Sequence, residues 1–161
     1  MKAGTILGLD FGERRIGVAL SDTGKSLASG LMTIDRRAQP DYLEALDPII
    51  REENVEAIVV GYPLRTDGTA PAGAKIEAVD AFIAGLESRF GLPVHREDES
   101  FTSSLAADSL RARAGMGLGA GGKARKGGRK GSQRAREKAD IDRVAACYIL
   151  QDYLDNRPGT R

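Results

Sequence analysis

The chain has 161 residues, enough for one domain with a substantial core, and its apolar and charged fractions, 41% and 29%, are ordinary for a globular protein. No apolar run approaches the roughly 20 residues that span a bilayer, and the first residues do not resemble a secretory signal. With one cysteine and one histidine, an intrachain disulfide is excluded and a Cys/His zinc site is not expected. We therefore expect a cytoplasmic protein.

The net charge of +1 conceals an asymmetry along the chain. Residues 1–100 carry 11 basic and 17 acidic side chains, a net charge of −6, whereas residues 101–161 carry 13 and 6, a net charge of +7. An acidic part joined to a basic part is typical of a protein that binds a polyanion. An uneven surface charge without a partner is the alternative.

The first residues predict three consecutive strands with short connections. Ile6–Leu9 is an apolar run too short for a helix, and from Ile16 to Leu20 large apolar residues alternate with small ones. A third strand falls near Ala28–Ile34, after a turn that contains Gly24. Because the connections are short, we expect an antiparallel meander.

The rest of the chain alternates helical and extended patterns. The β-branched run Ala57–Val60 predicts a central parallel strand, because it is apolar on both faces, and Leu92–Arg96 begins another strand. Apolar residues at helical spacing predict helices over Tyr42–Glu53 (which contains Pro48), Ala72–Phe90, a segment after Thr102, and Ala139–Leu154. The expected fold is therefore α/β: a five-stranded mixed sheet, with three strands in the meander and two parallel strands, and helices on both faces. This is the plan of a ribonuclease H-like fold.

Three acidic residues fall where this plan can bring them together. Asp10 ends the first strand, Glu99 follows the last strand, and Asp142 lies on the apolar face of the final helix. Three carboxylates at one point repel unless divalent cations bridge them. Two Mg²⁺ or Mn²⁺ ions held there could activate water against a phosphodiester, so we predict that these acids are catalytic metal ligands. The structural alternatives are a turn role for Asp10 and a helix-dipole role for Asp142.

A glycine-rich basic segment lies at about 115–138. Residues 111–138 contain ten basic side chains and one acidic side chain, and eight glycines lie between Gly115 and Gly131. Such a segment cannot bury a core, so we expect a flexible loop that holds phosphates; a solvated linker is the alternative. The predicted nucleic-acid-binding residues are Arg14, Arg15, Lys123, Arg125, Lys126, Arg129 and Lys130.

Four ordered motifs carry a family resemblance from Gly8 to Leu154. They are Gly-Leu-Asp10-Phe-Gly-Glu-Arg-Arg-Ile-Gly, Val-Val-Gly61-Tyr-Pro63 with Asp67-Gly68-Thr69, Asp98-Glu99-Ser-Phe-Thr102, and Ile-Asp142-Arg-Val-Ala-Ala. The chain resembles the YqgF family of pre-16S rRNA nucleases and Holliday-junction resolvase-like proteins. The resemblance implies a ribonuclease H-like fold and a metal-dependent phosphodiesterase, and the family's acids fall on Asp10, Glu99 and Asp142. Ser100 departs from the arginine that the family usually has there.

The leading hypothesis is a divalent-metal-dependent endonuclease that acts on structured nucleic acid. The resemblance points to 5′-end processing of pre-16S rRNA in ribosome biogenesis. The alternatives are a Holliday-junction resolvase that acts on branched DNA and a non-catalytic nucleic-acid-binding module. An ATPase of the actin and sugar-kinase fold also starts with Asp-x-Gly but needs two domains. We expect one domain over residues 1–161, as a monomer or a homodimer.

Overall fold

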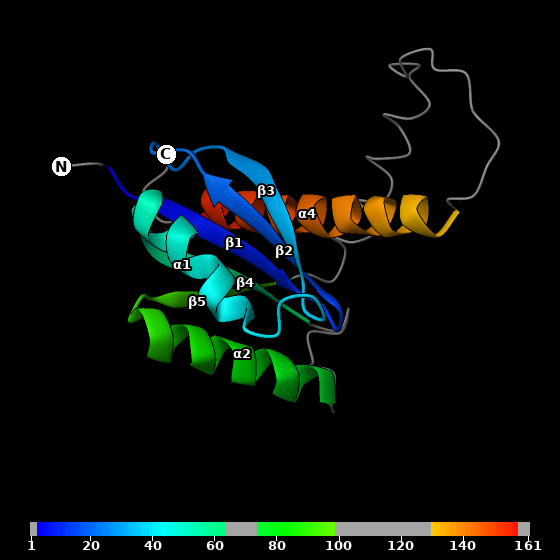
Figure 1. The fold of residues 1–161 in the computed structure, drawn as a ribbon. Coiled ribbons are helices and arrows are strands. Elements are labelled where there is room, and N and C mark those ends of the chain that lie inside the picture. Colours follow the sequence, from blue (N-terminus) through cyan, green and yellow to red (C-terminus); the bar gives the residue numbers. More distant parts are fainter. Residues whose placement is uncertain (1–2, 64–73, 99–129, 158–161) are drawn as a thin grey trace, which may run out of the picture.

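The computed structural model describes residues 3–63, 74–98 and 130–157. Glu99, the helix expected after Thr102 and the basic residues between 123 and 129 lie outside the described residues. Within the described part, five strands form one sheet with the order β3-β2-β1-β4-β5 (Figure 1). The strands are β1 (Thr5–Phe11), β2 (Arg15–Ser21), β3 (Ala28–Asp35), β4 (Val55–Tyr62) and β5 (Val94–Asp98).

The strand directions confirm the predicted mixed sheet. β1 pairs antiparallel with β2 and β2 antiparallel with β3, whereas β4 runs parallel to β1 and β5 parallel to β4. The carboxyl ends of β1, β4 and β5 therefore lie at the same edge of the sheet. In α/β sheets this edge is the usual place for a ligand.

Helices cover both faces of the sheet, as predicted (Figure 1). α1 (Tyr42–Glu52) and α2 (Ala74–Phe90) pack on one face, and α4 (Lys130–Asn156) packs on the other. α1 begins where the Asp41 side chain accepts the Glu44 backbone N–H at 3.0 Å, and it continues through the exposed Pro48. No helix in the described ranges is both long enough and apolar enough to cross a membrane.

The side chains of β1 alternate between the two cores. Leu7 and Leu9 are fully buried on the side of α1 and α2, whereas Ile6 packs with Ala146 and Ile149 of α4. This alternation follows from the two-residue period of a strand. By the same alternation, the even-numbered residues of β1 face α4.

α4 begins earlier than the sequence pattern predicts. The expected start was Ala139, with a flexible loop up to residue 138, but the helix begins at Lys130. Its first turns extend beyond the sheet (Figure 1), and Arg136, Glu137 and Lys138 are exposed there. Arginine, lysine and glutamate are good helix formers, so residues 136–138 are helical although they are exposed. For residues 130–138 the predicted loop was wrong.

Candidate active site

Asp10 lies near the carboxyl end of β1 and is partly buried. It shares a side of the strand with Ile6 and Gly8, which face α4. In the antiparallel pair of β1 and β2, the Cα partner of Asp10 is Gly17, and such partners lie about 4.5–5.5 Å apart. The Asp10 side chain is therefore on the α4 side of the sheet, next to Gly17.

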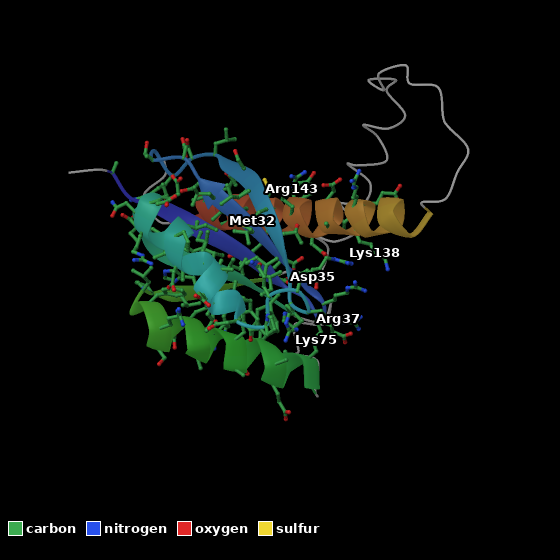
Figure 2. All side chains as sticks on the ribbon, in the orientation of Figure 1. Met32, Asp35, Arg37, Lys75, Lys138 and Arg143 are labelled. Atoms are coloured by element: carbon green, nitrogen blue, oxygen red, sulfur yellow. The ribbon has the colours of Figure 1, made fainter. Side chains whose placement is uncertain are left out.

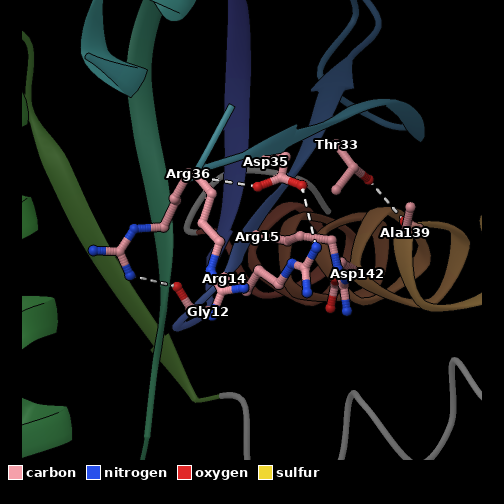
Figure 3. A network of polar contacts seen from close by, with 9 residues as sticks. Gly12, Arg14, Arg15, Thr33, Asp35, Arg36, Ala139 and Asp142 are labelled. Carbon is pink, nitrogen blue, oxygen red and sulfur yellow. Dashed lines mark hydrogen bonds and ion pairs between the residues drawn. The ribbon is translucent and has the colours of Figure 1, made fainter. Parts of the chain in front are cut away.

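α4 brings Asp142 to the same place. A Cβ atom built on Gly17 would lie 1.9 Å from the Asp142 carbonyl oxygen, so only glycine allows the helix to approach this closely. The Thr33 hydroxyl donates to the Ala139 carbonyl oxygen at 2.7 Å and fastens the preceding helical turn to β3 (Figure 3). Asp10, as a strand partner, and Asp142, through its backbone, are thus both neighbours of Gly17.

Two further glycines lie against side chains of α4. A Cβ on Gly8 would lie 2.6 Å from Leu150 Cβ, and a Cβ on Gly30 would lie 2.7 Å from Arg143 Cγ. Together with Gly17, these glycines place one residue without a side chain on each of β1, β2 and β3. The helix can therefore lie directly on the backbone of three adjacent strands.

Arg15 forms an ion pair with Asp142 (Figure 3). Arg15 Nε donates to Asp142 Oδ2 at 2.8 Å, and the two side chains are 16% and 28% exposed. Burial raises the pKa of the Asp142 carboxyl above its usual range, while the Arg15 guanidinium opposes this rise. The ion pair joins two predicted site residues that are 127 positions apart, and sequence reasoning did not foresee it.

Arg36 stabilises the turn between β1 and β2, which carries Arg14 and leads into Arg15. Its Nη1 donates to the carbonyl oxygens of Gly12 and Glu13, at 2.8 Å each (Figure 3 shows the Gly12 contact). Its guanidinium lies 4.5 Å from the centre of the Phe11 ring, an arrangement favourable for a cation and an aromatic face. Arg36 is not among the residues predicted from the sequence, where its place after a predicted strand is the only signal.

The end of β5 contributes a second group of acids. Glu97 is the Cα partner of Gly61 in the parallel pair of β4 and β5. Burial, together with the nearby Asp152 and Asp98, raises the pKa of the Glu97 carboxyl. Burial, with Asp155 and Asp98, likewise raises the pKa of Asp152. Glu99 is the next residue after Asp98 in the chain and lies outside the described residues.

The donor chemistry of the described acids suits a hard divalent cation. Asp10 and Asp142 offer carboxylate oxygens, the ligands that Mg²⁺ and Mn²⁺ prefer. Among residues 3–63, 74–98 and 130–157, no group of three or more His, Cys, Asp and Glu residues is close enough together to hold a metal ion. The predicted third acid, Glu99, is outside these ranges.

Basic side chains lie around this end of the sheet. The Arg14 side chain is about half exposed, and its Nη2 lies 3.9 Å from Asp35 Oδ2. In Figure 2, Arg37 and Lys75 lie near the end of the sheet at which β1 ends, and Lys138 lies on α4. Of the predicted loop residues, Lys130 begins α4, whereas Lys123, Arg125, Lys126 and Arg129 lie outside the described residues.

Two solved structures with a similar fold are complexes with Holliday junctions. The fowlpox virus resolvase in complex with Holliday junction DNA matches with a TM-score of 0.55 and 10% identity, over 94% of this chain and 97% of that chain. RuvC of T. thermophilus, also in complex with a Holliday junction substrate, matches with a TM-score of 0.50 and 14% identity, over 98% of this chain and 97% of that chain. At these identities the likeness shows the fold alone.

Sequence relatives cover almost the whole chain. A protein of Syntrophus aciditrophicus (strain SB) named "Putative pre-16S rRNA nuclease" is 39% identical over 93% of this chain and 87% of its own length. A protein of the same name from Moorella thermoacetica (strain ATCC 39073 / JCM 9320) is 41% identical over 93% of this chain and 94% of its own length. The profile of the RuvX family, described as Holliday junction resolvase, matches residues 4–156. The resemblance to the YqgF family is confirmed, and the chain belongs to the RuvX family.

Proposed function

We propose that this protein is a divalent-metal-dependent endonuclease that hydrolyses phosphodiester bonds in structured nucleic acid. One observation carries the proposal: α4 brings the Asp142 backbone against Gly17, the strand partner of Asp10. Two acidic residues from opposite ends of the sequence thus adjoin the same glycine, at the edge of an α/β sheet where ligands usually bind, and this supports a shared site.

The acids would hold the cofactor through oxygen atoms. Asp10 and Asp142, with Glu99 as the third ligand, would hold Mg²⁺ or Mn²⁺, two ions in the full site. Such ions activate a water molecule and stabilise the charge that develops on a phosphodiester. The partial burial of Asp10 and Asp142 limits competing water and strengthens every charge interaction in the site.

The basic residues would hold the phosphates on either side of the cleaved bond. Arg14 is exposed on the turn beside the acids, and Lys123, Arg125, Lys126, Arg129 and Lys130 belong to the basic segment. Contacts of this kind fix the position of a nucleic acid but do not read its sequence. Arg15 is also a proposed phosphate contact, and in this structure its guanidinium binds Asp142.

The name of the sequence relatives favours precursor 16S rRNA as the substrate, with cleavage at the 5′ end during ribosome biogenesis. We accordingly place the reaction in the cytoplasm. The family description favours a four-way DNA junction instead. Symmetric cleavage of a junction needs two active sites, and therefore a two-fold homodimer, whereas trimming one RNA end needs only a monomer.

Side-by-side cleavage of precursor 16S rRNA and four-way DNA tests the proposal. With Mn²⁺ we expect cleavage that a chelator abolishes, and a loss of about 100-fold or more in the rate for Asp10→Asn, Glu99→Gln and Asp142→Asn. Glu137→Gln, which removes an exposed carboxylate of α4, is the matched control. Undiminished cleavage by the Asp10 and Glu99 variants would remove these residues from catalysis. Nucleic-acid binding with no cleavage and no metal binding would identify a non-catalytic binding module.

A further inference from the structure

The ion pair between Arg15 and Asp142 occupies part of the proposed metal site. Arg15 uses Nε and Asp142 uses Oδ2, 2.8 Å apart, so one carboxylate oxygen carries this contact. Both side chains are more than two-thirds shielded from solvent. A carboxylate in such a place needs a positive partner, because an unpaired buried charge is strongly unfavourable.

Arg15 and a metal ion would each neutralise the Asp142 carboxylate. Each supplies positive charge to the same carboxylate, and two positive charges so close together repel, particularly where water is partly excluded. An arginine that only orients a metal ligand would strengthen metal binding. An arginine that neutralises the ligand when no metal is bound would weaken it.

Arg15 has another acidic neighbour that favours the second role. The Arg37 backbone N–H lowers the pKa of the Asp35 carboxyl, and the positive charges of Arg14 and Arg15 lower it further. Asp35 is also the Cα partner of Arg15 in the antiparallel pair of β2 and β3, so Arg15 has two acidic neighbours, Asp142 and Asp35. If the Arg15 guanidinium leaves Asp142, the Asp35 carboxylate is still close enough to attract it.

We infer that Arg15 is the internal counter-ion of Asp142 in the metal-free protein and that it competes with a divalent cation for this carboxylate. The inference rests on the proposed function, because it takes Asp142 as a metal ligand. It assigns Arg15 a role that phosphate binding alone does not include: Arg15 keeps the site folded and neutral before metal binds.

Calorimetric titration of the full chain with Mn²⁺, without nucleic acid, tests the competition. We expect Arg15→Gln to bind Mn²⁺ at least tenfold more tightly than the wild type. Arg89→Gln is the matched control, because it breaks a 2.5 Å ion pair with Asp47 between α1 and α2, on the opposite face of the sheet; its affinity should equal that of the wild type. Without metal, Arg15→Gln should have a lower Tm, and saturating Mn²⁺ should raise this Tm by more than it raises the wild-type value.

The outcomes separate the inference from the proposed function. Equal or weaker Mn²⁺ binding by Arg15→Gln overturns the inference, while binding by the wild type leaves the metal-dependent nuclease intact. If neither protein binds Mn²⁺ at millimolar concentration, both the metal-dependent nuclease and the competition are refuted.

A measurement on the wild type keeps the test open if Arg15→Gln does not fold. The arginine Nε–H signals can be followed by ¹H–¹⁵N NMR during a titration with diamagnetic Mg²⁺, with Arg15→Lys to assign the Arg15 signal. We expect the Arg15 signal to shift and to exchange faster with solvent as Mg²⁺ binds, while the Arg89 signal stays unchanged. An Arg15 signal that does not move at saturating Mg²⁺ contradicts the competition.

Discussion

The Asp142 backbone lies directly against Gly17, so that a Cβ atom on this glycine would be 1.9 Å from the Asp142 carbonyl oxygen. Gly17 is also the strand partner of Asp10. The separation of the two proposed metal ligands therefore depends on a residue that has no side chain. Any atom added there must push the helix away from the sheet.

Substitution of Gly17 by alanine should damage both stability and activity. We expect Gly17→Ala to lower the free energy of unfolding by about 1–3 kcal/mol, because overpacking forces the backbone to shift, and to reduce cleavage more than the loss of folded protein explains. Denaturant unfolding and the cleavage assay measure the two effects. Gly85→Ala is the control, because its Cβ would lie at an ordinary 3.4 Å from Leu43 Cδ1. Within a helix, alanine is more stable than glycine by about 0.5–1 kcal/mol. Wild-type activity in Gly17→Ala would contradict this dependence.

Replacing Arg36 by lysine should loosen the turn between β1 and β2. The guanidinium donates to two carbonyl oxygens of the turn and lies over the Phe11 ring, and an ammonium group cannot reproduce this planar arrangement. We expect a loss of about 1–2 kcal/mol in unfolding free energy and weaker nucleic-acid binding. Arg37→Lys, at the exposed neighbouring position, should change neither. If the two variants behave alike in denaturant unfolding and in binding, Arg36 does not organise the turn.

Asp22 should make stability depend on pH in the acid range. The backbone N–H groups of Leu27 and Ser26 donate to its carboxylate and hold its pKa below the ordinary value of 3.8. The stabilisation is therefore fully present above pH 3.8 and is lost as the pH falls through the lower pKa of the folded state. We expect wild type to be more stable than Asp22→Asn near neutral pH, with a difference that shrinks on acidification. Unfolding free energies of both proteins at several pH values measure this difference in stability. A difference that grows toward acid would refute the role given to Asp22.

Neutralising the basic segment should flatten the salt dependence of binding. Replacement of Lys123, Arg125, Lys126, Arg129 and Lys130 by glutamine removes up to five phosphate contacts. The slope of log K against log salt should become shallower by about 3.5–4.5 units if all five residues bind phosphates. Arg51→Gln, in the last turn of α1, is the control. An unchanged slope would show that the segment does not contact phosphates.

The strands were predictable because their patterns are local. Alternation after Ile16 and the β-branched run Ala57–Val60 are visible in short windows, and the sheet confirms both the meander and the parallel strands. The position of Asp10 near the end of a strand and that of Asp142 in the final helix were also predictable, because both follow from periodic patterns. The role of Glu99 as a metal ligand stays a prediction.

Other features depend on contacts that no short window contains. Arg15 and Asp142 are 127 positions apart, and nothing near Arg15 marks an acid as its partner. The sequence pattern predicts a later start for α4 than the structure has, because glycine is unfavourable in a helix and basic residues do not form an apolar stripe. Burial is the usual stabiliser of a helix, but the exposed residues 136–138 need only good helix propensity.

The early start of α4 predicts how far the protein's contacts extend along the nucleic acid. Lys130 precedes Asp142 by twelve helical residues, which at 1.5 Å each amounts to about 18 Å. The last part of the basic segment, from Lys130 onward, is thus a helical arm that separates the residues before it in the chain from Asp142. On a duplex with about 3.4 Å per base pair, 18 Å corresponds to roughly five base pairs. Footprints on the nucleic acid should therefore reach at least half a helical turn past the cleaved bond on the side of this arm.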